Sequence, residues 1–326
     1  MLANGKPMKL VFCGTPRFAV PTLERLAKAG HAIELAVTQP DRPIGRGHLL
    51  TPPPVKLLAE QLGIPVAQPE KIKTNPEFEA RLRAIQPEAI VVVAYGRIVP
   101  PWMLDLPPLG NLNLHASLLP KYRGAAPIQW AVANGETITG ATTMRINEGL
   151  DTGPILLAED LPIGPHQTAE EIAPLLAECG AGLMLETLRG LKHGSLHARP
   201  QDDSAVTLAP ILTREDAHID FSRSAQQIYN RWRGFQPWPG AYTFLRARKL
   251  TIHRMRPALR ASSPTSGAAP DAAPGAVAVD QGRLFVAAGQ ASWIEALEVQ
   301  LEGRKKLSAR DFLQGVSLAA GERLGS

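Results

Sequence analysis

Short apolar runs alternate with stretches of helical spacing over the first 190 or so residues of the chain. The runs predict strands, and stretches with apolar residues at i, i+3 and i+4 predict helices between them. The predicted strands are 9–13, 32–38, 65–67, 89–94, 111–115, 140–145 and 154–160, and the predicted helices are 18–29, 55–61, 77–85, 126–134 and 169–192. Residues 89–94 are unbroken apolar sequence, which is typical of a central parallel strand buried on both faces. The alternation predicts an α/β fold with a doubly wound, mostly parallel, Rossmann-like sheet.

The pattern changes in the last third of the chain. Residues 194–210 are polar and punctuated by prolines, and we expect them to be a linker. Strand-like pieces follow at 240–245, 249–255, 275–280, 283–287 and 293–301, and a low-complexity stretch at 261–274 is expected to be an inter-strand loop. Five short strands in succession predict a small β-barrel of the oligonucleotide-binding (OB-like) type. The predicted domains are therefore 1–193 and 211–326, joined by 194–210.

Composition narrows the class of protein. With 326 residues, 44% of them apolar and 20% charged, the chain has the profile of a globular protein with at least one large core. We find no apolar stretch long enough to span a membrane and no secretory signal at the start. Cys13 and Cys179 lie in apolar surroundings far apart in the sequence, so we expect buried thiols and neither a disulfide nor a metal site. A cytoplasmic protein is expected.

The net charge of +5 is distributed unevenly along the chain. Residues 1–207 hold 19 Lys and Arg against 20 Asp and Glu, which leaves 16 against 10, a net +6, in residues 208–326. This excess indicates a polyanionic partner for the C-terminal domain, although an ordinary solvated surface would explain it equally well.

The candidate chemistry lies where two predicted strands end. Asn113 and His115 are two residues apart on one strand, so their side chains project from the same face. They are near the carboxyl end of that strand, where open α/β sheets place their sites. Asp151 lies between Gly149 and Gly153 in a turn where the backbone can approach a ligand closely. An amide, an imidazole and a carboxylate are suited to acyl or formyl transfer without a metal.

Two further segments invite a ligand-binding interpretation. Gly14 lies at the first strand-to-helix turn, but the Gly-x-Gly-x-x-Gly pattern of dinucleotide-binding folds is missing there. No acidic residue ends the second predicted strand, so a structural turn is favoured over dinucleotide binding. Residues 38–56 form a long proline-rich stretch carrying Arg42, Arg46 and His48, and its prolines limit helix or sheet. A loop of this length is either functional or a variable insertion, and its cationic side chains suit it to phosphates.

Together these residues resemble the 10-formyltetrahydrofolate-dependent formyltransferases. The resemblance rests on Asn113 and His115, the turn 117–120, the run 123–127 and the Gly-Leu-Asp-Thr-Gly sequence at 149–153. The basic stretch 38–47 and the segment 235–240 resemble the members of that family that act on tRNA. The resemblance extends over about residues 10–313.

The resemblance implies that the formyl group of 10-formyltetrahydrofolate passes to the α-amino group of methionine on initiator methionyl-tRNA. Asn113 would donate a hydrogen bond to the oxyanion, His115 would stabilise it or protonate the leaving nitrogen, and Asp151 would orient His115 or relay the amine proton. The folate site would be lined by Ser117, Leu118, Leu119 and Pro120, with 94–98 nearby. The candidate tRNA contacts are Arg42, Arg46, Arg304, Lys305 and Lys306. A monomer is expected, and no resident metal.

Several alternatives stay open at this point. A formyltransferase acting on an amino-sugar nucleotide would share the Asn-x-His and Asp set, and even the Pro-Trp-Pro-Gly segment. The arginine-bearing 38–56 stretch argues against that acceptor, because a small sugar nucleotide does not require it. The basic C-terminal domain argues against a glycinamide-ribotide formyltransferase and against a hydrolase that releases formate. The intact triplet argues against an RNA-binding module without activity.

Overall fold

The computed structural model describes residues 7–44, 49–258, 272–319 and 322–325, and the chain divides into two compact units. Unit 1 comprises Met1–Pro127, Ile138–Ile163 and Glu171–Pro210, and unit 2 comprises Ile128–Thr137, Gly164–Glu170 and Ile211–Ser326, as far as these ranges are described. The expected linker, 194–210, therefore lies within unit 1, and the units interleave along the chain. The division into functional domains 1–193 and 211–326 stays a prediction.

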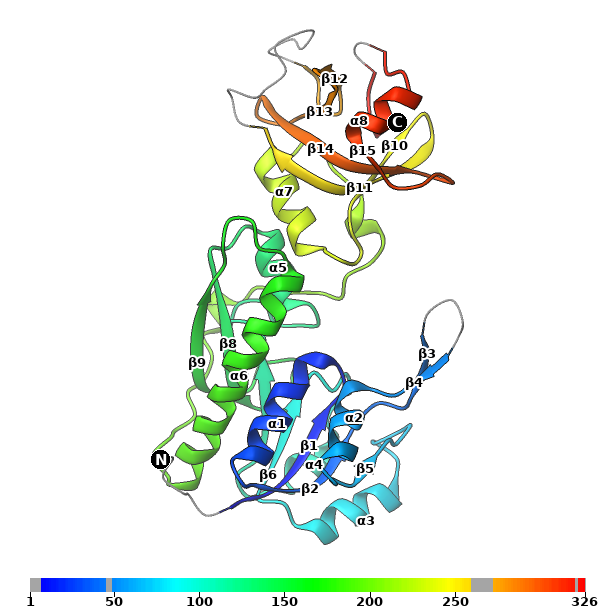
Figure 1. Ribbon diagram of the computed structural model, residues 1–326. Helices are drawn as coiled ribbons and strands as arrows, with labels where there is room; N and C mark the ends of the chain where they lie inside the picture. Colours follow the sequence, from blue (N-terminus) through cyan, green and yellow to red (C-terminus); the bar gives the residue numbers. More distant parts are fainter. Residues whose placement is uncertain (1–6, 45–48, 259–271, 320–321, 326) are drawn as a thin grey trace. The chain divides into compact units, whose positions relative to one another are not determined.

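Unit 1 is built on a seven-stranded sheet in the order β5-β2-β1-β6-β7-β8-β9 (Figure 1). The strands are β1 (Lys9–Gly14), β2 (Ala32–Val37), β5 (Val66–Ala67), β6 (Ala89–Val93), β7 (Asn111–His115), β8 (Ile138–Arg145) and β9 (Ile155–Pro162). The first five pair in parallel, whereas β8 runs antiparallel to β7 and β9 antiparallel to β8. The mostly parallel sheet predicted from the sequence is confirmed.

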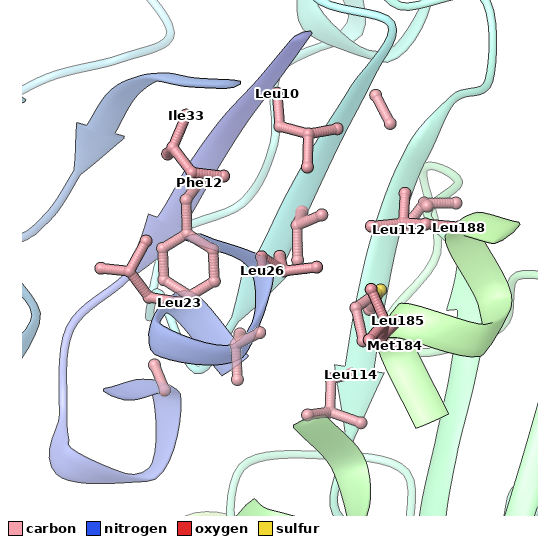
Figure 2. Close-up of a cluster of buried hydrophobic side chains, with 14 of the residues drawn as sticks. Leu10, Phe12, Leu23, Leu26, Ile33, Leu112, Leu114, Met184, Leu185 and Leu188 are labelled. Carbon is pink, nitrogen blue, oxygen red and sulfur yellow. The ribbon is translucent and has the colours of Figure 1, made fainter. Parts of the chain in front are cut away.

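Helices cover both faces of this sheet. They are α1 (Val20–Lys28), α2 (Pro54–Gln61), α3 (Pro76–Ile85), α4 (Pro101–Leu104) and α6 (Ala169–Lys192), with a 3-10 turn η1 at Arg17–Ala19 and another, η2, at Asp203–Ala205. Residues of α1, α2 and α6 share one core cluster, and residues of α3 and α4 share another. Figure 2 shows part of the first cluster, with Leu23 and Leu26 of α1 beside Phe12 and with side chains of α6 beside Leu112 and Leu114. Residues of β1 alternate between the clusters, as period-2 geometry requires.

The basic stretch 38–56 contains two short paired strands, although its prolines were expected to limit helix or sheet. Strands β3 (Arg42–Ile44) and β4 (Leu49–Thr51) pair antiparallel, with Pro43 opposite Leu50. Both strands of a two-stranded ribbon are edge strands, so the missing N–H of a proline is tolerated there. Arg46 and His48 lie outside the described residues.

Unit 2 contains an antiparallel sheet in the order β10-β11-β14-β13-β12, with β15 paired to β14. The succession of short strands is confirmed, and their closure into a barrel stays a prediction. Its strands are β10 (Tyr242–Leu245), β11 (Arg248–Pro257), β12 (Val277–Asp280), β13 (Arg283–Ala288), β14 (Ser292–Leu301) and β15 (Leu307–Ser308). Its helices are α5 (Pro127–Ala133), α7 (Ala225–Gly234) and α8 (Ala309–Gly315), with the 3-10 turn η3 at Glu215–Ala217. All five predicted strands are present. Helices α7 and α8 were not predicted, although Ser224 and Gln227 form a capping box at the start of α7.

No described helix combines the length and the apolar character needed to cross a membrane. The longest helix, α6, contains an internal proline and charged residues at both ends.

A buried carboxylate in unit 2, paired with two partly exposed arginines, makes the stability of this unit dependent on pH. Glu295 of β14, 4% exposed, accepts hydrogen bonds from Arg283 of β13 and Arg256 of β11 at 2.7–2.8 Å. The Arg283 hydrogen bond is the largest effect on the Glu295 pKa; together with Arg256 it outweighs burial and lowers the pKa below its ordinary value. A carboxyl group whose folded-state pKa is depressed stabilises the fold above its unfolded-state pKa, and loses that contribution as the pH falls through the folded-state value.

Glu295→Gln is therefore expected to lower the free energy of unfolding of unit 2 by about 2 kcal/mol at pH 7, because charge-assisted hydrogen bonds are lost. The difference from wild type should shrink as the pH falls through about 4.3, where the unfolded carboxyl is half protonated. Urea unfolding at pH 7 and at pH 3.5–4 measures both effects, with the exposed Glu302→Gln as a control. A difference that stays constant between these pH values would contradict the assignment.

Candidate functional site

The candidate site is built on β7, the last of the parallel strands, which lies between β6 and the antiparallel strand β8. Leu112 and Leu114 point into the core cluster that contains α6 residues. The alternate positions Asn113 and His115 therefore face the other side of the sheet, as the sequence spacing predicted. The adjacent strand β8 holds this end of β7 in register, with His115 opposite Thr142.

The imidazole of His115 is buried and fixed by two neighbours. Its Nε2 lies 2.9 Å from the carbonyl oxygen of Tyr122, and its Nδ1 lies 3.7 Å from Oδ2 of Asp151. A carbonyl oxygen can only accept, so Nε2 carries a hydrogen and donates it. Nδ1 is therefore the nitrogen that can take up or release a proton. Its distance from Asp151 lies within ion-pair range and beyond a direct hydrogen bond.

Asp151 lies in the loop between β8 and β9. Its φ of 53° is in the left-handed region, and its carboxylate accepts a hydrogen bond of 3.0 Å from the backbone N–H of Gly124. Gly153 is needed for close packing within the chain: a Cβ at this position would lie 1.7 Å from the carbonyl oxygen of Arg145. The sequence had suggested that the glycines of this turn leave room for a ligand. The structure shows that Gly153 instead allows the chain to pack against the carbonyl oxygen of Arg145.

Asn113 stands out because its amide is uncommitted. It is half-buried, and its side chain makes no hydrogen bond within the described residues, whereas Asn111 donates to the carbonyls of Met103 and Leu104. Polar groups at such positions are normally paired with protein, water or ligand. The Asn113 amide is thus available to donate to a substrate oxygen.

The turn 117–120 follows β7 closely and is held by hydrogen bonds to Lys121 and to Thr142 of β8. The Ser117 hydroxyl donates to the carbonyl of Lys121 at 2.6 Å. Thr142 donates to the carbonyl of Ser117 at 2.7 Å and accepts from the backbone N–H of Leu119 at 3.1 Å. Ser117 and Leu119 are buried, whereas Leu118 and Pro120 are partly exposed. Leu118 and Pro120 are therefore the more accessible members of the predicted folate site.

The loop 94–98 is tied to the end of β2 by a side-chain network. Thr15 and Gln39 both donate to the carbonyl of Tyr95, at 3.2 and 3.1 Å, and Arg97 donates to the Gln39 side chain at 3.1 Å. The Gly14 turn is tight, since a Cβ there would lie 2.8 Å from the Phe12 ring and 3.0 Å from the Val93 carbonyl oxygen. These contacts agree with the structural interpretation of Gly14.

Two residues of the expected linker, 194–210, hydrogen-bond to the backbone of this site and were not predicted from the sequence. Thr207 accepts from the backbone N–H of Tyr122 and, through its carbonyl, from that of Arg123, at 2.8 and 2.9 Å. The Gln201 amide donates to the carbonyls of Asp151 and Gly153 at 2.8 and 2.7 Å. No local pattern marks these polar residues, because their partners lie about 50 to 85 positions away in the sequence.

The predicted tRNA contacts are on the surface of the two units. Arg42 is exposed on β3 in unit 1, and Arg304, Lys305 and Lys306 are exposed after β14 in unit 2. Lys306 pairs with Glu298 at 2.9 Å, which reduces its value as a phosphate ligand. Arg46 lies outside the described residues. Among the described residues, no group of three or more His, Cys, Asp and Glu is arranged to hold a metal ion.

Curated relatives resemble this chain over nearly its whole length. A methionyl-tRNA formyltransferase from Acidobacterium capsulatum is 63% identical over 319 residues, covering 98% of this chain and 100% of the relative. A protein of the same name from Koribacter versatilis is 56% identical and covers 98% of this chain and 99% of the relative.

Solved structures share the fold at much lower identity. An N-formyltransferase from Helicobacter canadensis, in complex with folinic acid and dTDP-3-aminofucose, has a TM-score of 0.65 at 17% identity, over 89% of this chain and 98% of that one. HypX from Aquifex aeolicus in complex with tetrahydrofolic acid has a TM-score of 0.60 at 14% identity, over 94% of this chain and 47% of that one. This chain spans about half the length of HypX.

Two protein-family models match this chain, one in its N-terminal part and one in its C-terminal part. The model described as formyl transferase matches residues 8–188, which include β7 and the Asp151 loop. The model described as formyl transferase, C-terminal domain, matches residues 211–317. With these matches and the full-length relatives, the chain belongs to the formyl transferase family.

Proposed function

We propose that this protein transfers the formyl group of 10-formyltetrahydrofolate to the α-amino group of methionine on initiator tRNA. The observation that carries the chemistry is the arrangement of Asn113, His115 and Asp151 at the end of β7. The observation that carries the acceptor is the full-length similarity, at 63% and 56% identity, to proteins named methionyl-tRNA formyltransferase. We expect the protein to work as a monomer in the cytoplasm.

The residues have complementary roles in the transfer. The amine nitrogen forms a bond to the formyl carbon, the bond from that carbon to N10 of the folate breaks, and the proton lost by the amine replaces the formyl group on N10. The uncommitted Asn113 amide would donate to the formyl oxygen as negative charge develops on it. Because Nε2 of His115 is occupied by the Tyr122 carbonyl, Nδ1 and Asp151 would carry the proton.

The test measures where labelled formyl goes. Purified protein with labelled 10-formyltetrahydrofolate is given methionyl-initiator tRNA and an amino-sugar nucleotide in competition, with free methionine in a separate reaction. We expect label on the aminoacyl-tRNA only. Equal labelling of the sugar nucleotide would support the alternative acceptor, and release of formate without transfer would support a hydrolase; either result would refute the proposal.

The salt dependence of tRNA use tests the predicted phosphate contacts. Each Lys or Arg that neutralises a phosphate contributes about 0.7–0.9 to the slope of log affinity against log salt concentration. Arg42→Ala and Lys305→Ala are each expected to raise the KM for tRNA at low salt and to reduce that slope by about that amount, with kcat little changed. The exposed Lys73→Ala serves as a charge-matched control. Slopes identical to the control would show that these side chains do not contact phosphate.

A further inference from the structure

We propose that Gln201, in the segment between the predicted domains, is a positioning residue that fixes the relative placement of Asp151 and His115. The inference rests on the proposed function, since it assigns those two residues to the reacting site. Gln201 itself is not placed against a substrate.

The side chain of Gln201 uses its full hydrogen-bonding capacity. Its Nε2 donates to the carbonyl oxygens of Asp151 and Gly153, at 2.8 and 2.7 Å. Its Oε1 accepts from Nε and Nη2 of Arg123, at 3.0 and 2.7 Å. An amide offers two N–H donors and two lone pairs, and all four are engaged here. One side chain therefore joins the Asp151 loop to Arg123.

Gln201 contacts the backbone of Asp151 directly, and it contacts Arg123, whose two neighbours bond to His115 and Asp151. Arg123 stands between Tyr122, whose carbonyl accepts from His115, and Gly124, whose N–H donates to the Asp151 carboxylate. Both Tyr122 and Asp151 have a left-handed backbone, with φ of 61° and 53°. Non-glycine residues hold that conformation only where the surroundings impose it. The Gln201 amide supplies such a constraint directly at Asp151, and at Tyr122 through Arg123.

A substitution at Gln201 can remove its side-chain hydrogen bonds while the backbone of residues 194–210 stays bound to the rest of unit 1. Arg199 exchanges two backbone hydrogen bonds with Ile155. The backbone N–H of Arg123 donates to the carbonyl of Thr207, and its carbonyl accepts from the N–H of Ala209. None of these bonds involves the Gln201 side chain. The buried Arg123 guanidinium also keeps its partner Asp203 at 2.9 Å. A substitution at 201 should thus loosen the Asp151 loop and leave the surrounding chain docked.

The first test is kinetic. Gln201→Met keeps the length of the side chain and removes its hydrogen bonds to Arg123, Asp151 and Gly153, together with the weaker one to the Met144 sulfur at 3.9 Å. Gln201→Glu keeps the acceptor for Arg123 and places a carboxylate against two carbonyls. Both variants are expected to lower kcat on the order of 30-fold, somewhat less than the roughly 10²-fold cost of misplacing a reacting group by about 1 Å, with less than twofold change in the KM for tRNA. Asp202→Asn is the control, since Asp202 is exposed and, within the described residues, its side chain bonds only to Ser204.

A double-mutant cycle separates positioning from a general structural role. If Gln201 acts through Asp151, the loss caused by Gln201→Met should shrink to less than about sixfold in an Asp151→Asn background. A loss larger than that in the Asp151→Asn background, or a Gln201→Met variant as active as wild type, would overturn the proposal.

A spectroscopic measurement does not depend on turnover. In protein labelled with 15N-histidine, the neutral His115 ring should show the Nε2–H form, and Gln201→Met should shift its signals while Asp202→Asn should not. Unchanged His115 signals in Gln201→Met would overturn the proposal. Wild-type protein that fails to formylate tRNA would refute the proposed function instead, and the His115 spectra would still report on Gln201.

Discussion

Asn113→Ala is expected to lower kcat for formyl transfer about 10²–10³-fold, the usual cost of losing one donor to a developing oxyanion. The side chain has no other hydrogen bond within the described residues, so its removal should leave the fold intact. The core contacts of β7 come from Leu112 and Leu114 on the opposite face. Steady-state kinetics with methionyl-tRNA, together with thermal unfolding of the variant, measures both expectations.

Asn113→Asp is the matched variant for this prediction. It keeps the shape of the side chain and replaces the N–H donor with a charged acceptor, so it should be at least as impaired as the alanine variant. KM for tRNA should change little in either case, because the amide is proposed to act on the formyl oxygen. An Asn113→Ala protein that folds normally and retains more than a tenth of the wild-type kcat would remove Asn113 from the reaction.

The fold of unit 1 was predictable because its signals are local. Period-2 alternation placed Leu112 and Leu114 in the core and Asn113 and His115 on the other face, and the structure has β7 at the predicted residues. The unbroken apolar run at 89–94 predicted a central strand, and β6 lies between β1 and β7 with every residue buried. These patterns arise from burial, which repeats along a strand and can be recognised without a partner.

The parts that could not be predicted depend on distant partners or on weak local signals. Residues 194–210 have the composition of a linker, yet Gln201 and Thr207 hold the backbone around Asp151 and Tyr122. Helix α7 begins at a capping box, but its buried residues include Asn230 and Arg233, which an apolar pattern does not mark. The hairpin β3–β4 was missed because a proline in an edge strand costs little. The side-chain contacts of Gln201 and Thr207 do not repeat along the chain, so no periodic pattern in the sequence predicts them.

The position of Asp151 is set by backbone packing as well as by side chains, and Gly153 is where that packing is tightest. A methyl group at 153 would lie 1.7 Å from the Arg145 carbonyl oxygen, far inside any real contact. Arg145 cannot yield easily, because it ends β8 opposite Leu112 of β7 and its N–H bonds to Pro154 at 3.0 Å. The loop itself must therefore shift, and it would carry Asp151 away from Gly124 and His115.

Gly153→Ala is accordingly expected to lower kcat by about 10²-fold or more, since a displacement of about 1 Å at a reacting group has that effect. The free energy of unfolding should fall by about 1–3 kcal/mol from overpacking. Gly182→Ala is the control, because its Cβ would meet only the mobile end of Arg25 at 3.0 Å and alanine favours the α6 helix. Kinetics and urea unfolding of both variants, at a temperature where both are folded, separate loss of position from loss of fold. Full activity in Gly153→Ala would mean that transfer does not require Asp151 at its observed distance from His115.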